Sequence, residues 1–257
     1  MSEGKVQFSV TDGVASVVFD RPHARNAMTW AMYEGLSRAC KEIAGNPAIK
    51  VAVLRGAGGE AFVAGTDIAQ FTEFTAEDGV KYEERIAASI GEIEAIKKPM
   101  IAAVEGWCTG GGLIIAATCD FRIATPTAKF GVPVAKTLGN CLSAENVARL
   151  IAAFGQARAK RVLMLAEMVG AEEAKELGFV HTIAASAEFD GAVAAMAGKL
   201  KEHAPLTMQA SKEAMRRLLH AKIPDDVDLV RLCYGSKDFK EGISAFLGKR
   251  KPNWQGR

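Results

Sequence analysis

Hydrophobic and polar positions alternate at the start of the chain and then change period. In residues 5–21 apolar and polar side chains alternate on both sides of Asp12-Gly13, which predicts a β-hairpin with a tight turn. From Thr29 to about residue 44 the spacing becomes helical, with Thr29 as the predicted N-cap. The apolar positions of that helix are Met32, Leu36, Ala39 and Ile43.

Two nearly continuous apolar segments predict strands that are buried on both faces. They are residues 49–56 (IKVAVLRG) and 100–106 (MIAAVEG). A helical pattern over residues 79–96 lies between them and is ended by Pro99. Shorter segments then predict a buried helix at 113–120 and strands at 121–125 and 128–131.

The chain becomes mostly helical beyond Ser143. One apolar face carries Val147, Leu150, Ile151 and Phe154. Further helices are predicted at 158–166, 171–177, 187–202, 206–220 and about 237–247. Strands and helices thus alternate in the first two thirds and helices dominate the end, which predicts an α/β core with a helical C-terminal extension.

Composition and charge narrow the classes of protein. With 257 residues and 49% hydrophobic content, the chain can build one large core. The formal net charge of +2 comes with no basic face, which disfavours nucleic-acid binding, and the short basic run 249–251 fits a solvated tail. The N-terminus lacks the features of a secretory signal, and no apolar stretch reaches the roughly 18 residues that span a bilayer, so no membrane partner is expected.

Cysteine and histidine usage predicts neither disulfides nor a metal site. The five cysteines are widely spaced and form no CxxC pair, which favours buried, reduced thiols in a cytoplasmic protein. The four histidines show no metal-ligand spacing. The cysteines are Cys40, Cys108, Cys119, Cys141 and Cys233.

Two glycine-rich loops follow the two buried strands. Glycine allows φ > 0 and a close approach of the backbone to a ligand, and the first N–H groups of a helix lack internal partners. Gly110–Gly112 run into an apolar helical segment and therefore predict one half of an oxyanion hole, with a second N–H from residues 64–68 (AGTDI). Each such donor lowers the barrier by about 3 kcal/mol. The alternative, in which the glycines only permit tight helix–strand packing, stays open.

A dinucleotide-binding interpretation competes with this one. Gly56, Gly58 and Ala61 match G-x-G-x-x-A after a strand. No helical pattern follows directly, however, and no acidic residue ends a following strand, so the pattern disfavours a nicotinamide site. Neither loop is followed by GK[ST], which excludes a P-loop.

Five segments in this order resemble the enoyl-CoA hydratase/isomerase (crotonase) superfamily over essentially the whole chain. They are VVFDRPHARNAM, GAGGEAFVAGTDI, KKPMIAAVEGWCTGGG, CDFRIATPTAKFGVP and DFKEGISAFLGKRKPNW. The resemblance implies a crotonase-like (ClpP/crotonase) α/β spiral of β/β/α turns over residues 1–200. It also implies a helical trimerisation region at 201–257, a homotrimer or dimer of trimers, and an acyl-CoA thioester as ligand. Coenzyme A is then part of the substrate, and no separate cofactor is expected.

The resemblance also assigns site residues. It places the oxyanion hole at the backbone N–H groups of Thr66 and Gly111. The segment from Ala24 to Asn26 would meet the adenine and pantetheine of coenzyme A, and Arg25 would offer charge to a phosphate. The implied substrate-binding positions are Ala24, Arg25, Asn26, Ala64, Asp67, Ile68, Gly110, Ile114 and Val134.

The chain departs from the family's hydratases at two catalytic positions. Those enzymes carry one glutamate two positions after the triple glycine and another directly after FG-x-P. Here the two positions are Ile114 and Val134, whose side chains cannot transfer protons. We therefore expect an acyl-CoA lyase or isomerase that stabilises an enolate but catalyses a reaction other than two-glutamate hydration. The candidate reactions are isomerisation, decarboxylation, thioester hydrolysis and hydration of an atypical substrate. The alternative is a catalytically degenerate acyl-CoA-binding protein.

Several residues are candidates for the missing proton transfer. Asn140 lies where some family members carry a catalytic aspartate, but an amide is not a useful base. Glu145 is the nearest acid, and the pattern favours a structural role in the first turn of a helix capped by Ser143. We expect packing roles for Cys108 and Thr109, and solvated positions for Glu73, Glu83 and Glu84. The few polar groups near the site indicate an apolar or aromatic acyl group.

Overall fold

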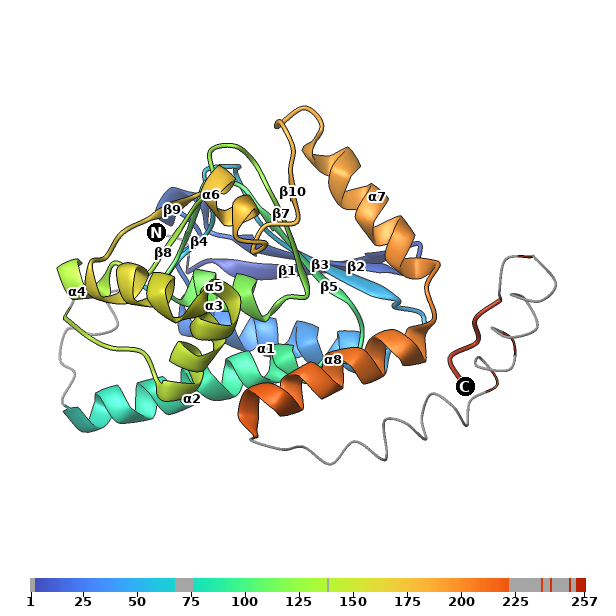
Figure 1. Ribbon diagram of the computed structural model, residues 1–257, viewed down its shortest axis with the longest axis horizontal. Coiled ribbons are helices and arrows are strands. Elements are labelled where there is room, and N and C mark those ends of the chain that lie inside the picture. The colour runs from blue at the N-terminus through green and yellow to red at the C-terminus, as the bar shows by residue number, and fades with distance from the viewer. Residues whose placement is uncertain are drawn as a thin grey trace.

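The computed structural model shows an α/β protein built on two sheets (Figure 1). It describes residues 3–67, 76–137, 139–221, 237, 241, 250 and 253–257. The six-stranded sheet has the order β1 (Lys5–Thr11), β2 (Val14–Asp20), β3 (Val51–Gly56), β5 (Met100–Val104), β7 (Phe121–Ala124) and β10 (Thr182–Ile183). The four-stranded sheet has the order β4 (Ala61–Ala64), β6 (Trp107–Thr109), β8 (Lys129–Gly131) and β9 (Val169–Gly170).

The chain passes from one sheet to the other in successive β/β/α turns. β3 and β4 are followed by α2 (Ala76–Glu94), and β5 and β6 by α3 (Gly111–Thr118). β7 and β8 are followed by α4 (Val134–Thr137) and α5 (Ala144–Met164). β3, β5 and β7 pair in parallel in one sheet, as β4, β6 and β8 do in the other. This is the α/β spiral that the resemblance implied.

Helices cover both faces of the six-stranded sheet. On one face α1 (Trp30–Gly45), α2 and α3 enclose the larger apolar core, which also contains Leu54 and Ala102 of the sheet. On the other face α7 (Phe189–Lys201) packs against residues of β3, β5 and β7 (Figure 1). Parallel strands buried on both faces need continuous apolar sequences, and the segments 49–56 and 100–106 meet that need.

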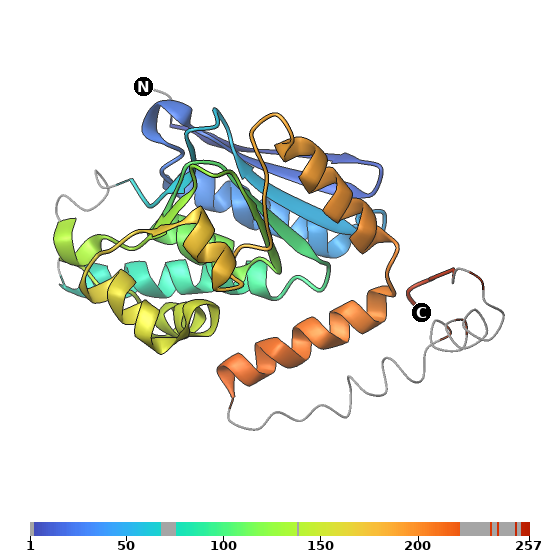
Figure 2. The same cartoon turned by 45° about the horizontal axis from the view of Figure 1, so that its top comes forward.

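The C-terminal helices lie outside the two sheets. α6 (Ala171–Glu176) packs beside β9 and β10, and α8 (Pro205–His220) runs below the main core (Figure 2). Lys212 attaches α8 by donating to Asp120 Oδ2 at 2.8 Å. No residue of α8 is buried. Such an exposed helix has a face available for further packing.

Local sequence signals confirm several predicted boundaries. Asp12 (φ 48°) and Gly13 (φ 75°) both have positive φ in the hairpin turn between β1 and β2. Thr29 Oγ1 accepts from the Met32 N–H at 3.3 Å, which confirms the cap of α1. A short 3-10 helix, η1 (Pro22–Ala24), joins β2 to that region.

Other predictions were wrong or fall outside the described residues. The sequence pattern missed β4 and β6. Its division of residues 144–164 into two helices is confirmed, because two helical segments meet at the non-helical Gly155 (φ 73°) within α5. Ile151, expected on the apolar face of α5, is 40% exposed. Cys40, Cys108 and Cys119 are buried free thiols as expected, whereas Cys141 is exposed. Cys233 and most of the predicted helix 237–247 lie outside the described residues.

Candidate active site

The two glycine-rich loops leave the same edge of the four-stranded sheet. β4 and β6 are parallel, with Ala64 opposite Thr109, so both strands end side by side. A Cβ on Gly110 would lie only 3.4 Å from Gly65 Cα. The structure therefore brings together the two loops in which the sequence predicted oxyanion-hole donors.

The three glycines meet different backbone requirements. Gly110 is the N-cap of α3 with φ 53° and ψ −125°, a conformation that favours glycine, and its N–H donates to Gly131 O at 2.9 Å. A Cβ on Gly112 would lie 2.1 Å from Val63 O, so close helix–strand packing requires glycine there. Gly111 is the first residue of α3, where a backbone N–H has no partner within the helix.

The N–H groups of Thr66 and Gly111 are uncommitted within the described part of the chain. Around Thr66, Met28 N–H donates to Gly65 O and Asp67 N–H donates to Met28 O, which leaves the Thr66 N–H without a protein acceptor there. The Gly111 N–H likewise has none among the described residues. The Gly111 donor lies at the N-terminus of the buried helix α3, a setting that favours a negative charge.

A cluster of three hydroxyl groups lies beneath these loops. Thr66 Oγ1 is 2.8 Å from Tyr33 Oη and 2.8 Å from Tyr82 Oη. A Cβ on Gly111 would lie 3.1 Å from Tyr33 Oη, so the phenol fills the space beside that glycine. Burial raises the pKa of Tyr33, and burial also raises the pKa of Tyr82 to about 12. Both phenols are therefore neutral at physiological pH.

The segment from Ala24 to Asn26 is fixed to the first glycine-rich loop. Ala24 ends η1, and Arg25 (φ 51°) and Asn26 (φ 56°) both adopt the left-handed conformation. The Asn26 side chain is fully buried; its Nδ2 donates to Ala57 O at 2.9 Å and Ala61 O at 2.8 Å. The main chain adds a bond from Ala64 N–H to Arg25 O. This segment therefore lies beside the end of β4.

Charged residues surround that segment. Arg25 is exposed, pairs with Glu60 Oε1 at 2.7 Å and lies over the Trp107 ring at 5.8 Å. Asp67 pairs with Arg21 Nη2 at 2.8 Å, which anchors the end of the first loop. Ile68, the remaining predicted substrate-binding residue of this loop, lies outside the described residues.

Comparison with known proteins identifies the family. Residues 9–257 match the family model of enoyl-CoA hydratase/isomerase. The chain belongs to the enoyl-CoA hydratase/isomerase family. It is 34% identical over 250 residues to a crotonyl-CoA hydratase of Syntrophomonas wolfei, covering 94% of each chain. It is 32% identical over 258 residues to an (E)-benzylidenesuccinyl-CoA hydratase of Thauera aromatica, covering 98% of this chain and 99% of the relative.

Solved structures agree with this assignment. An enoyl-CoA hydratase/carnithine racemase from Magnetospirillum magneticum superposes with a TM-score of 0.90 at 32% identity, over 98% of this chain and 96% of that one. An enoyl-CoA hydratase/isomerase family protein from Hyphomonas neptunium superposes with a TM-score of 0.89. The crotonase fold predicted from the sequence is thus confirmed.

In this member of the enoyl-CoA hydratase/isomerase family, the two positions compared with the hydratase glutamates are apolar. Ile114 is 1% exposed on α3 and belongs to the main core. Val134 begins α4 and is half-buried against the same core. Neither can supply or accept a proton.

The other sequence-based candidates for proton transfer lie at the surface. Asn140 is exposed in the loop before α5. Glu145 is exposed in the first turn of α5, 3.6 Å from Arg149 Nη2. Ser143 Oγ caps this helix by accepting from the Asn146 N–H at 3.4 Å. This arrangement fits the structural role that the pattern favoured for Glu145.

Glu83 on α2 differs from the solvated residue that the sequence indicated. Its side chain is half-buried, whereas Glu84 beside it is exposed. Glu83 Oε2 accepts from the Ser143 N–H at 2.8 Å, which ties α2 to the loop before α5. Burial raises the pKa of Glu83 above its ordinary value. Glu73 lies outside the described residues.

The cysteine and threonine before the glycines have packing roles. Cys108 is fully buried, and its Sγ donates to Gly112 O at 3.4 Å. Burial raises the pKa of Cys108 well above that of an ordinary thiol, so it is not a thiolate nucleophile. Thr109 is half-buried at the end of β6, where it pairs with Gly131 of β8.

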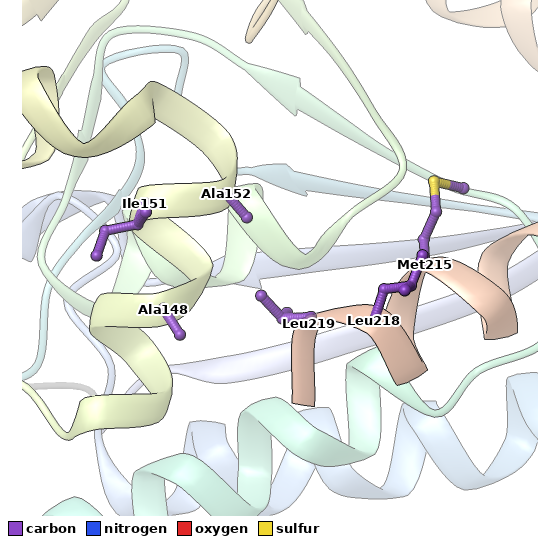
Figure 3. Close-up of a pocket in the computed structure, with 6 residues that line it drawn as sticks. All are labelled: Ala148, Ile151, Ala152, Met215, Leu218 and Leu219. Carbon is purple, nitrogen blue, oxygen red and sulfur yellow. The ribbon is translucent and has the colours of Figure 1, made fainter. Parts of the chain in front are cut away.

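An apolar groove lined by no residue of the glycine-rich loops lies between α5 and α8 (Figure 3). Its volume is about 480 Å³. It is lined by Ala148, Ile151, Ala152, Met215, Leu218 and Leu219.

Within the described residues no helix is long and apolar enough to cross a membrane. The same part of the chain contains no group of three His, Cys, Asp or Glu side chains placed to hold a metal ion.

Proposed function

We propose that this protein processes an acyl-CoA thioester by stabilising its enolate between the N–H groups of Thr66 and Gly111. The observation that carries the proposal is the convergence of the two glycine-rich loops: a Cβ added to Gly110 would lie 3.4 Å from Gly65 Cα. The dipole of α3 adds to the stabilisation of a negative oxygen at its N-terminus. Family membership supports an acyl-CoA substrate, with coenzyme A as part of it and no further cofactor.

The reaction differs from two-glutamate hydration. Ile114 and Val134 offer no carboxylate at the two positions on which that mechanism depends. An enolate-stabilising site still supports lyase and isomerase chemistry at the carbon next to the thioester. Preorganised donors of this kind contribute about 3 kcal/mol each. The proposed activity is therefore that of an acyl-CoA lyase or isomerase.

The segment from Ala24 to Asn26 is the proposed binding site for the adenine and pantetheine of coenzyme A. Its backbone is fixed next to the end of β4 by Asn26, so a bound ligand would extend from this segment towards Thr66. The Arg25 guanidinium is exposed and available to a phosphate once Glu60 exchanges its partner. The apolar side chains of Ile114 and Val134 favour an apolar or aromatic acyl group. The relative from Thauera aromatica is named for an acyl-CoA of the aromatic class.

The test is a panel of thioesters in D₂O: butyryl-CoA, crotonyl-CoA and cinnamoyl-CoA. Mass spectrometry would follow any change of product mass and the incorporation of deuterium at the α-carbon. We expect deuterium incorporation, because an enolate exchanges its α-proton with solvent. Turnover or exchange with none of the thioesters would contradict the proposal.

The alternative function is that of a catalytically degenerate acyl-CoA-binding protein. The observation that favours it is the replacement of both carboxylate positions by apolar residues. Tight binding of butyryl-CoA by calorimetry, without exchange or turnover in the panel, would support this alternative.

We further propose that the chain assembles as a homotrimer or a dimer of trimers through its C-terminal region, 201–257. Support comes from α8, which has no buried residue and carries Met215 at 63% and Leu218 at 59% exposure. Light scattering after chromatography would measure the assembly. The pair of changes Met215→Lys and Leu218→Lys should shift the mass towards the monomer, and an unchanged trimer would contradict a role for this helix face.

A further inference from the structure

Glu83 is a half-buried carboxylate on α2, the helix that contacts the first glycine-rich loop through Tyr82. It directly follows Tyr82, whose Oη is 2.8 Å from Thr66 Oγ1. Thr66 Oγ1 also lies 2.8 Å from Tyr33 Oη, and a Cβ added to Gly111 would lie 3.1 Å from that same phenol oxygen. Contacts therefore connect the neighbour of Glu83 to both residues that carry the proposed donors.

A hydrogen bond from the backbone before α5 fixes the Glu83 carboxylate. Its Oε2 accepts from the Ser143 N–H at 2.8 Å, in the loop that leads from Val134 to α5. This loop contains the positions at which the sequence suggested catalytic replacements. The Glu83 carboxylate thus ties α2 to the loop before α5, whereas Asn140 and Glu145 are exposed.

We infer that Glu83 moves protons to and from the α-carbon of the bound thioester, in place of the two carboxylates that are absent at Ile114 and Val134. This inference rests on the proposed function. A half-buried carboxylate fixed by a backbone N–H can perform general acid–base catalysis when a substrate lies within reach. Burial also raises the pKa of Glu83, which brings its proton affinity closer to the value that suits proton transfer at neutral pH.

The proton-transfer step balances without an added reagent. The Glu83 carboxylate takes the α-proton, so the C–H bond breaks and an O–H bond forms on Glu83. The electron pair moves to the thioester oxygen, which the N–H groups of Thr66 and Gly111 stabilise. Return of the proton, or of a deuteron after exchange with D₂O, regenerates the carboxylate and the thioester.

The decisive experiment compares α-proton exchange of butyryl-CoA in D₂O by the wild type, Glu83→Gln and Glu84→Gln. Glutamine keeps an oxygen that accepts the Ser143 N–H, but it cannot take up a proton as a base. We expect Glu83→Gln to slow exchange by about 10²-fold to 10⁴-fold while the Kd for butyryl-CoA, measured by calorimetry, stays within a factor of three. Glu84→Gln, the exposed neighbour, should exchange like the wild type.

A pH profile and a shorter acid separate proton transfer from a structural role. The exchange rate of the wild type should rise as Glu83 loses its proton, with a midpoint above the ordinary pKa of glutamate, and Glu83→Gln should lack this rise. The titratable and polar groups that face Glu83 are Tyr33 on α1, Tyr82 on α2 and Ser143 before α5. Glu83→Asp should retain part of the exchange.

The outcomes distinguish this inference from the proposed function. A wild type that binds butyryl-CoA but exchanges no α-proton overturns the enolate chemistry and, with it, the role of Glu83. A wild type that exchanges at the same rate as Glu83→Gln overturns the inference alone. A Glu83→Gln protein that loses affinity and thermal stability together with exchange would show a structural role instead.

Discussion

The proposed site has a main-chain half and a side-chain half, and the two are built differently. The main-chain half consists of the loops after β4 and β6, which are fixed by strand pairing and by backbone bonds such as Gly110 N–H to Gly131 O. The side-chain half consists of the hydroxyl cluster, Glu83 and the loop before α5. The first half depends on the fold and tolerates almost no added atom, whereas the second depends on individual side chains. A change of reaction within this fold therefore affects mainly the second half.

Adding one methyl group to the main-chain half should have the largest effect. A Cβ on Gly112 would lie 2.1 Å from Val63 O, and that oxygen belongs to a strand that cannot move independently. We expect Gly112→Ala to lower the free energy of unfolding by more than about 3 kcal/mol. Thermal unfolding followed by circular dichroism measures the effect.

The matched control is Gly91→Ala on α2, where an added Cβ meets nothing within 4 Å. This change should stabilise the helix slightly, because alanine loses less backbone entropy than glycine. Equal melting temperatures for Gly112→Ala and Gly91→Ala would contradict the close packing of α3 against β4.

Glutamates placed at Ile114 and Val134 test whether the main-chain half supports hydration once both carboxylates are supplied. Ile114→Glu buries a carboxylate at a position that is 1% exposed, and we expect it to cost about 2–4 kcal/mol of stability. Val134→Glu should cost less because Val134 is half-buried. If the main-chain half is competent, the double variant should hydrate crotonyl-CoA, measured by the loss of enoyl absorbance.

The single variants provide the comparison for that experiment. Neither has both carboxylates of the two-glutamate mechanism, so each should hydrate crotonyl-CoA far more slowly than the double variant. A folded double variant that binds crotonyl-CoA without hydrating it would show that the loops do not polarise the thioester.

Removal of the Asn26 side chain should loosen the main-chain half without changing a loop residue. Asn26→Ala leaves the Arg21 N–H, Ala57 O and Ala61 O without their buried partner. We expect a loss of about 2–3 kcal/mol in urea unfolding, together with weaker binding of butyryl-CoA. Asn46→Ala, which removes only hydrogen bonds at the surface, should have a much smaller effect, and an equal loss in both variants would contradict the role of Asn26 in holding the first loop.

The link between the two halves should give the smallest effect. Tyr82→Phe removes one of the two phenol contacts to Thr66 Oγ1 and leaves the contact from Tyr33. We expect a cost of about 1 kcal/mol in the free energy of unfolding, measured by urea denaturation. The references are the wild type and Tyr33→Phe, which removes the other phenol contact to Thr66 Oγ1. Tyr33 is more deeply buried, and its change should cost at least as much.

The sequence predicted the main-chain half better than the side-chain half for physical reasons. Continuous apolar segments identify β3 and β5, and the glycines that follow them mark the two loops that the structure brings together. β4 and β6 were missed because Ala61–Ala64 and Trp107–Thr109 are too short to show a period. Their parallel pairing, which brings the loops together, is a long-range property that local pattern does not contain.

The side-chain half requires tertiary information. No local signal brings Tyr33, Thr66 and Tyr82 together, since 33 and 16 residues separate the pairs in contact. For Glu83 a partial signal existed. Ile86, Ile90 and Ile93 form the buried face of α2, and Glu83 precedes Ile86 by three positions, so it lies beside that face. The spacing could have predicted partial burial, but it could not have predicted the contact with Ser143.

Asp120 connects α8 to β5, a strand that comes much earlier in the sequence. One of its oxygens, Oδ2, accepts from both the Met100 N–H at the start of β5 and Lys212 Nζ on α8. Lys212 follows Asp120 by 92 residues, so the anchoring carboxylate is synthesised well before α8. The residues of the proposed acyl-CoA site likewise precede, in the chain, the segment proposed to join neighbouring subunits.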